Sequence, residues 1–179
     1  MVLVVVTGFG PFGSVVGSNP SSANLEKISD RVIVVRDVGV SVRAVDALIE
    51  RLGTDEVVCI HFGVNEQARK FQFEKFAYNE KTFRIPDVDG LVFHGDPIDP
   101  SLPTGHRLGT LLAMPWFVDC DVSEDPGRYI CNYMYYKSLV VSGGRSIFIH
   151  VPPYTIMPKH EQELLVESII EFIVTTHDG

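Results

Sequence analysis

The sequence has few cysteines, few basic residues and no long apolar run, and each shortage excludes a class of protein. The three cysteines, Cys59, Cys120 and Cys131, include no C-x-x-C pair, which argues against a zinc ribbon. Their small, odd number predicts free thiols in the reducing cytoplasm. No stretch approaches the roughly 18 apolar residues of a membrane span. The apolar start at residues 1–6 lacks the basic flank of a signal peptide.

The charge balance is acidic, with 23 Asp and Glu against 15 Lys and Arg and a formal net charge of -8. A nucleic-acid backbone or an anionic membrane is bound by a basic face, so we expect neither as a partner. We also expect no metal and no other cofactor, because the histidines in predicted loops and helix ends lack metal-ligand spacing; these are His94, His106, His160 and His177.

The length of 179 residues predicts one domain over 1–179, and apolar β-branched runs alternate along it with helical patterns. This order predicts an α/β fold with an open, twisted, mostly parallel central sheet and helices on both faces, an α/β/α sandwich. The expected strands are 2–6, 32–35, 57–62, 116–118 and 147–151, with an extended arm at 71–76. One expected helix begins at Asn19–Pro20, and the others span 41–52, 108–112, 125–139 and 161–174. The expected loops are 8–17 and 80–104.

A glycine-rich segment, Gly8-Phe9-Gly10-Pro11-Phe12-Gly13, follows the first strand and matches G-x-G-x-x-G. With Asp37 after the second strand, it raises the hypothesis of a nucleotide-binding module. Against this, Pro11 removes a backbone donor, and the next helix begins six residues after the last glycine. A plain tight loop, or an apolar pocket lined by Phe9 and Phe12, remains open as an alternative.

Cys131 is the candidate nucleophile among the three thiols. Taking Asp125 as the helix cap places it in the second turn, where the helix dipole can still favour a thiolate. An inert, buried helical cysteine is the more common case. Cys59 lies inside an apolar strand, and Cys120 lies between two aspartates that raise a thiol pKa, so neither is expected to react.

Two histidines and one glutamate are candidates for proton chemistry. His150 ends a buried strand and precedes Pro152-Pro153, so it is either a general base at the ligand-binding edge of the sheet or a core histidine. His61 has a similar place on the third strand, but no obvious nucleophile follows it. Glu74, among aromatic residues, could orient a histidine, although a solvated side chain is the commoner outcome.

These features fall in five segments that together resemble the pyroglutamyl-peptidase I (pyrrolidone-carboxylate peptidase) family of cysteine peptidases. The segments cover nearly the whole chain in order: Thr7 to Gly13 with Asn19-Pro20-Ser21, His61 to Val64 with Phe73-Glu74-Lys75, Arg84 to Asp87, Gly127 to Tyr133, and Phe148 to Pro153. The resemblance implies an omega-peptidase that cleaves after an N-terminal pyroglutamyl residue through a thioester. The implied partners are peptides that begin with pyroglutamate, and an oligomer is possible.

The resemblance also assigns roles to residues. It implies Cys131 as the nucleophile, His150 as the base and acid, and Glu74 as the carboxylate that orients it. The implied substrate-binding residues are Phe9, Phe12, Asn19, Val64, Arg84 and Ile130. A catalytically silent relative that binds pyroglutamyl ends stays open as an alternative. Residues 63–69 are less glycine-rich than is typical of the family, and the segment between Arg84 and Asp125 is shorter. These two departures leave the subsite preference and the oligomeric state undecided.

Overall fold

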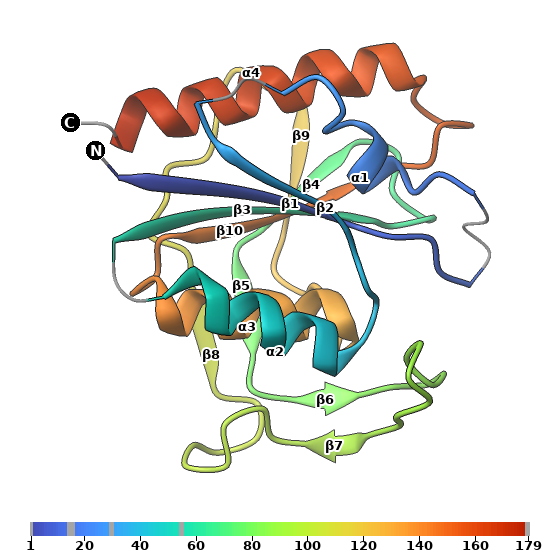
Figure 1. Ribbon diagram of the computed structural model, residues 1–179, viewed down its shortest axis with the longest axis vertical. Helices are drawn as coiled ribbons and strands as arrows, with labels where there is room; N and C mark the ends of the chain where they lie inside the picture. The colour runs from blue at the N-terminus through green and yellow to red at the C-terminus, as the bar shows by residue number, and fades with distance from the viewer. Residues whose placement is uncertain (1, 14–16, 29–30, 54–55, 178–179) are drawn as a thin grey trace.

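A central six-stranded sheet runs through the computed structural model, which describes residues 2–13, 17–28, 31–53 and 56–177 (Figure 1). The strand order is β2-β1-β3-β10-β4-β9. β1, β2, β3 and β10 are parallel, β4 is antiparallel to β10, and β9 is parallel to β4, so the predicted mostly parallel sheet is confirmed. The bounds are β1 Leu3–Phe9, β2 Ile33–Val38, β3 Val57–Val64, β4 Phe71–Glu74, β9 Cys120–Ser123 and β10 Ser146–Val151.

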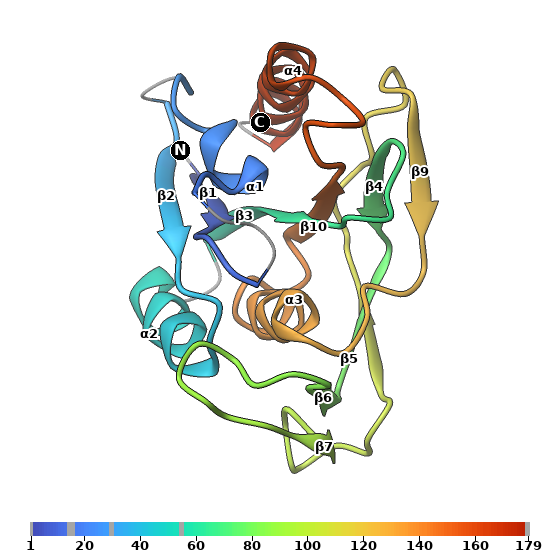
Figure 2. The same cartoon turned by 90° about the vertical axis from the view of Figure 1, so that its right-hand side faces the viewer.

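Helices cover both faces of this sheet, which confirms the predicted sandwich (Figure 2). α1 (Pro20–Ala23) and α4 (Lys159–His177) lie on one face, and α2 (Val42–Leu52) and α3 (Ile130–Val141) lie on the other. α2 follows its sequence closely, because the Ser41 side chain caps its first turn and Gly53 ends it with a positive φ of 71°. No helix among the described residues is long and apolar enough to cross a membrane.

The core explains why the central strands do not alternate between apolar and polar residues. Every residue of β10 is buried, and so are all of β3 except its last residue and all of β1 except its first. One apolar cluster fills the space between the sheet and α4, and a second fills the space between the sheet and the α2–α3 layer. Strands covered on both faces need no polar side.

Two element predictions in the middle of the chain are wrong. The helix predicted at 108–112 is instead β8 (Arg107–Gly109), which pairs with β5 (Phe76–Tyr78) while the Arg107 guanidinium stacks 4.2 Å from the Phe76 ring. The strand predicted at 116–118 is a turn in which the Val118 N–H donates to the Pro115 carbonyl, and β9 begins only at Cys120.

The other irregular segments combine short strands with loop. The arm predicted at 71–76 is β4 of the central sheet followed by β5. The connection predicted at 80–104 contains a two-stranded sheet of β6 (Lys81–Thr82) and β7 (His94–Asp96). Near the N-terminus, the loop predicted from Gly8 begins only after Phe9, and its residues 14–16 lie outside the described residues.

Candidate active site

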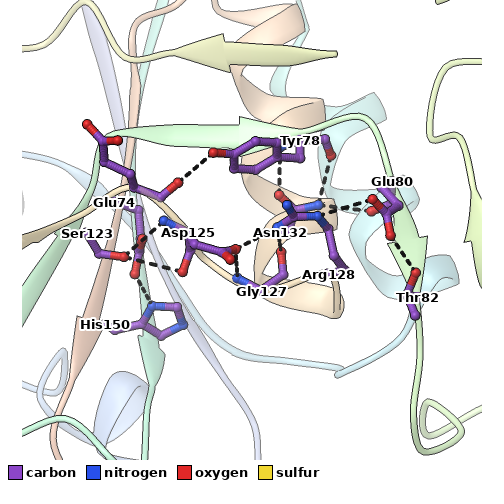
Figure 3. Close-up of polar contacts among 11 residues, drawn as sticks. Glu74, Tyr78, Glu80, Thr82, Ser123, Asp125, Gly127, Arg128, Asn132 and His150 are labelled. Atoms are coloured by element: carbon purple, nitrogen blue, oxygen red, sulfur yellow. Dashed lines mark hydrogen bonds and ion pairs between the residues drawn. The ribbon is translucent and has the colours of Figure 1, made fainter. Parts of the chain in front are cut away.

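His150 and Glu74 meet because β4 pairs in the antiparallel sense with β10. Glu74 lies directly opposite Phe148, and His150 is two residues further along β10, so both side chains project from the same face. His150 Nδ1 lies 2.7 Å from Glu74 Oε1, as Figure 3 shows. Both side chains are buried, and the Tyr135 hydroxyl fixes β4 at this point by donating to the Glu74 carbonyl at 2.9 Å.

The surroundings of His150 decide its charge. Burial of the ring lowers its pKa, but hydrogen bonds and charge interactions with Cys131 and Glu74 outweigh burial and raise the pKa to about 9. The imidazole is therefore protonated at neutral pH, held between a sulfur and a carboxylate. Glu74 Oε2 is buried and has no hydrogen-bond partner among the described residues.

Cys131 lies in the first turn of α3, one turn earlier than the sequence predicts. The helix begins at Ile130, with Tyr129 at the cap position. Asp125 does not cap it, because its carboxylate accepts from the Gly127 N–H and the Arg128 guanidinium in a local turn, where Gly127 has a positive φ of 78°. The first turn is where the helix dipole acts most strongly on a thiol, so the correction strengthens the case for a reactive Cys131.

Gly63 lets the sulfur approach the sheet. A Cβ atom on Gly63 would lie 3.1 Å from Cys131 Sγ and 2.7 Å from Cζ of Phe148. Any side chain at this position would displace one of the two. Sequence reasoning included Gly63 in a motif but gave it no role, and the signal that could have found it is its place inside a β-branched and apolar strand.

An apolar cavity of about 290 Å³ opens beside the sulfur. Five of the six implied substrate-binding residues line it together with Cys131: Phe9, Phe12, Asn19, Val64 and Ile130. Four more lining residues, Val40, Glu66, Ile85 and Tyr129, were not among the predicted site residues. Tyr129 could have been found from its place two residues before Cys131, whereas Val40 and Ile85 come from distant loops. The sixth residue, Arg84, lies in a neighbouring hollow that neither Cys131 nor His150 lines.

The glycine loop packs a helix and does not cradle phosphate. A Cβ on Gly8 would lie 2.2 Å from the Ser21 carbonyl oxygen, so this glycine admits α1 against β1. The Phe9 and Gly10 N–H groups already donate to Ser21 Oγ and to the Val38 carbonyl. The Asn19 amide donates to the Gly10 carbonyl at 2.9 Å and holds the loop open beside the cavity. The apolar-pocket alternative therefore fits the loop, and the nucleotide hypothesis finds no support in it.

A second hollow of about 410 Å³ adjoins the apolar cavity and also reaches Cys131. His150 lines this hollow but not the apolar cavity, whereas Cys131, Val64, Glu66 and Tyr129 line both. The Cys131 sulfur thus lies where an apolar compartment adjoins a more polar one that contains the imidazole. Glu66 was not among the site residues predicted from the sequence.

The remaining thiols and His61 are poor candidates for catalysis. Burial raises the pKa of Cys59 to about 11. Burial and the neighbouring Asp121 and Asp119 raise the pKa of Cys120, as its sequence position predicts. Burial lowers the pKa of His61 to about 3, and its Nδ1 lies 2.8 Å from the Thr7 hydroxyl oxygen, so it is a neutral core histidine. No cluster of ligands suited to a metal ion exists among the described residues.

Comparisons with known proteins agree with this geometry. The chain is 34% identical to human pyroglutamyl-peptidase 1 over 164 residues, covering 84% of this chain and 78% of the human protein. It is 31% identical to pyrrolidone-carboxylate peptidase of Pyrococcus furiosus over 170 residues, covering 83% and 80% of the two chains. The crystal structure of pyrrolidone carboxyl peptidase from Thermus thermophilus superposes with a TM-score of 0.78 at 26% identity, over 94% of this chain and 99% of that one. Residues 2–176 match the model of the pyroglutamyl peptidase family, and the chain belongs to that family.

Proposed function

We propose that this chain is a cysteine peptidase that removes pyroglutamate from the N-terminus of peptides, with Cys131 as nucleophile, His150 as base and acid, and Glu74 as the carboxylate that orients the imidazole. One observation carries the proposal: three side chains from α3, β10 and β4 line one hollow, and one of them, Cys131, also lines the adjoining apolar cavity. Residues 1–179 would act as one catalytic domain.

The cavity suits the pyroglutamyl ring, which is small, flat and uncharged. Phe9 and Phe12 offer apolar surface to its faces, and Asn19 brings a polar group to the cavity wall. No lysine or arginine lines the cavity among the described residues, and its one carboxylate, Glu66, stands at the boundary with the second hollow. A site that pairs the lactam N–H and C=O would reject proline, because its own polar groups would then stay unpaired.

The reaction follows from the order of the groups. His150 holds the proton of the Cys131 thiol, and the sulfur attacks the carbonyl carbon of the pyroglutamyl residue. Backbone N–H groups in the first turn of α3 face the developing oxyanion. The tetrahedral intermediate collapses as His150 gives its proton to the leaving amine, which leaves a thioester on Cys131. His150 then takes a proton from water, and the hydroxide attacks the thioester. The C–S bond breaks, pyroglutamate leaves, and the Cys131 sulfur is again paired with protonated His150.

A pyroglutamyl-fluorophore amide tests the assignment. We expect wild type to hydrolyse it, Cys131→Ala to lose at least about a thousandfold in kcat, and Cys120→Ala to keep its activity. Cys120 is the matched control because it is the other partly exposed free thiol among the described residues. Iodoacetamide should inactivate wild type with one alkyl group on Cys131. Full activity of Cys131→Ala would refute the nucleophile. Tight binding of a pyroglutamate analogue without turnover would instead identify a silent binding protein.

The cytoplasm is the compartment that we propose for this activity. Cys59, Cys120 and Cys131 are all free, and a nucleophilic thiol needs reducing surroundings to stay so. Fractionation of the source cells, with the pyroglutamyl-fluorophore amide as the reporter, tests this location.

A further inference from the structure

The second hollow is where the departing peptide must lie. Cys131 lines both compartments, but His150 lines only the second hollow. His150 has to reach the nitrogen of the scissile bond to protonate it. With the pyroglutamyl ring in the apolar cavity, the residue that follows it therefore occupies the hollow beside His150. This placement rests on the function proposed above.

Carboxylates are the most numerous charged groups in the lining of that hollow. Apart from His150, its charged lining residues are Glu66, Glu74 and Asp125, all carboxylates, and no lysine or arginine lines it among the described residues. Glu74 adds a buried oxygen, Oε2, that has no hydrogen-bond partner within the described part of the chain. Arg128 contacts Asp125 at 2.6 Å but lines the neighbouring hollow instead.

Glu66 has the most informative position of the three carboxylates. It is exposed, and it lines both compartments, so it stands beside the boundary where the scissile bond crosses from one to the other. The first residue of the departing peptide is the nearest part of the substrate on the polar side. A lysine or arginine at that position carries its charge on a flexible stem long enough to reach the rim of the hollow.

We propose that Glu66 is a specificity-determining residue that makes the enzyme favour peptides with lysine or arginine directly after pyroglutamate and disfavour those with glutamate or aspartate. An exposed ion pair contributes little, so each charge should change kcat/KM by about two- to fivefold relative to a neutral residue. The preference is electrostatic, and added salt should weaken it because the screening length falls to about 3 Å at 1 M salt.

The test compares three peptides that differ at one position: pyroglutamyl-Lys-Ala-amide, pyroglutamyl-Gln-Ala-amide and pyroglutamyl-Glu-Ala-amide. We expect the Lys/Glu ratio of kcat/KM in wild type to be about tenfold at low salt and to approach one at 1 M NaCl. Glu66→Gln should lower the ratio at least threefold, and Glu66→Lys should invert it. The matched control is Glu50→Gln, which removes an equal charge from the exposed surface of α2.

The outcomes separate this proposal from the one on which it rests. If wild type fails to cleave even the Gln peptide, the proposed function is wrong. If wild type cleaves all three peptides but the Lys/Glu ratio is the same in wild type and Glu66→Lys, the role of Glu66 is wrong while the peptidase assignment stands. A ratio that changes equally in Glu50→Gln would also overturn the role, because the effect would then come from net charge alone.

Discussion

The Gly63→Ala variant tests whether the position of the Cys131 sulfur depends on the absence of a side chain at residue 63. The added Cβ would lie 2.7 and 2.9 Å from the Phe148 ring and 3.1 Å from Cys131 Sγ, closer than van der Waals contact allows. Phe148 is fully buried, so its ring has little room to retreat. Overpacking of this kind costs about 1–3 kcal/mol of folding free energy. For a chain of this length that lowers Tm by about 2–10 °C.

The effect on activity should exceed the effect on stability. The sulfur has the freer path, because Cys131 is partly exposed, so part of the strain should move it away from His150. A displacement of a few tenths of an ångström predicts roughly a tenfold loss of kcat. The assay is kcat and KM on a pyroglutamyl-fluorophore amide, beside a thermal melt. Gly109→Ala is the control, because the atoms nearest to its Cβ would belong to the Phe76 ring, at 3.3 Å, and not to Cys131 or Phe148. Unchanged kcat in a folded Gly63→Ala protein would refute the reasoning.

Three further predictions concern charged side chains. Because the leaving amine needs protonated His150, kcat/KM should fall as pH rises through about 9. Glu74→Gln removes one of the groups that raise the pKa of His150, so this fall should begin at lower pH in the variant. An alkaline limb at the same pH in both proteins would contradict the pairing. The folded-state pKa lies above the usual 6.5, so the stability from this pair is complete below pH 6.5 and is lost towards pH 9, as denaturant titrations should show. Asp87 is 4% exposed and accepts from the N–H groups of Val42, Asp89 and Leu91, so Asp87→Ala should cost about 1–3 kcal/mol. It should also raise KM by loosening Ile85 at the cavity, and a lower Tm with unchanged KM would exclude that second effect.

The elements that the sequence predicts well are those that carry their own local signals. The helix expected over 41–52 has a serine cap, an apolar stripe and a terminal glycine, and α2 has the same bounds within a residue. The segment 108–112 has leucines at helical spacing, but pairing with β5 offers Leu108 a buried partner in Ala77 and overrides that pattern. Propensity yields to tertiary pairing where the segment is short.

The start of α3 shows a different limit. Asp125-Pro126-Gly127 has the composition of a helix start. In the structure, however, the Asp125 carboxylate accepts from the Gly127 N–H in a local turn, and the helix begins only at Ile130. Both uses of the aspartate satisfy a backbone donor, so the sequence alone cannot rank them. For the site, reasoning from residues alone favoured a solvated Glu74, which is 1% exposed in the fold. Its burial comes from the position of β4 between β10 and β9, which no local signal encodes.

The two buried histidines on β3 and β10 show how the fold makes one of them suited to proton transfer and leaves the other neutral. His61 and Phe148 are partners across β3 and β10, and Phe148 is in turn the partner of Glu74 across β10 and β4. The hydrogen-bond partner of the His61 ring is the Thr7 hydroxyl, and burial lowers the pKa of His61 to about 3. His150 is also buried, but it interacts with a carboxylate and a thiol, which raise its pKa to about 9. A six-stranded sheet in which all strands were parallel would not place a carboxylate beside His150 in this way. The reversal of direction at β4 places Glu74 beside His150, and this carboxylate helps to raise the pKa of the imidazole that the proposed reaction uses as its acid.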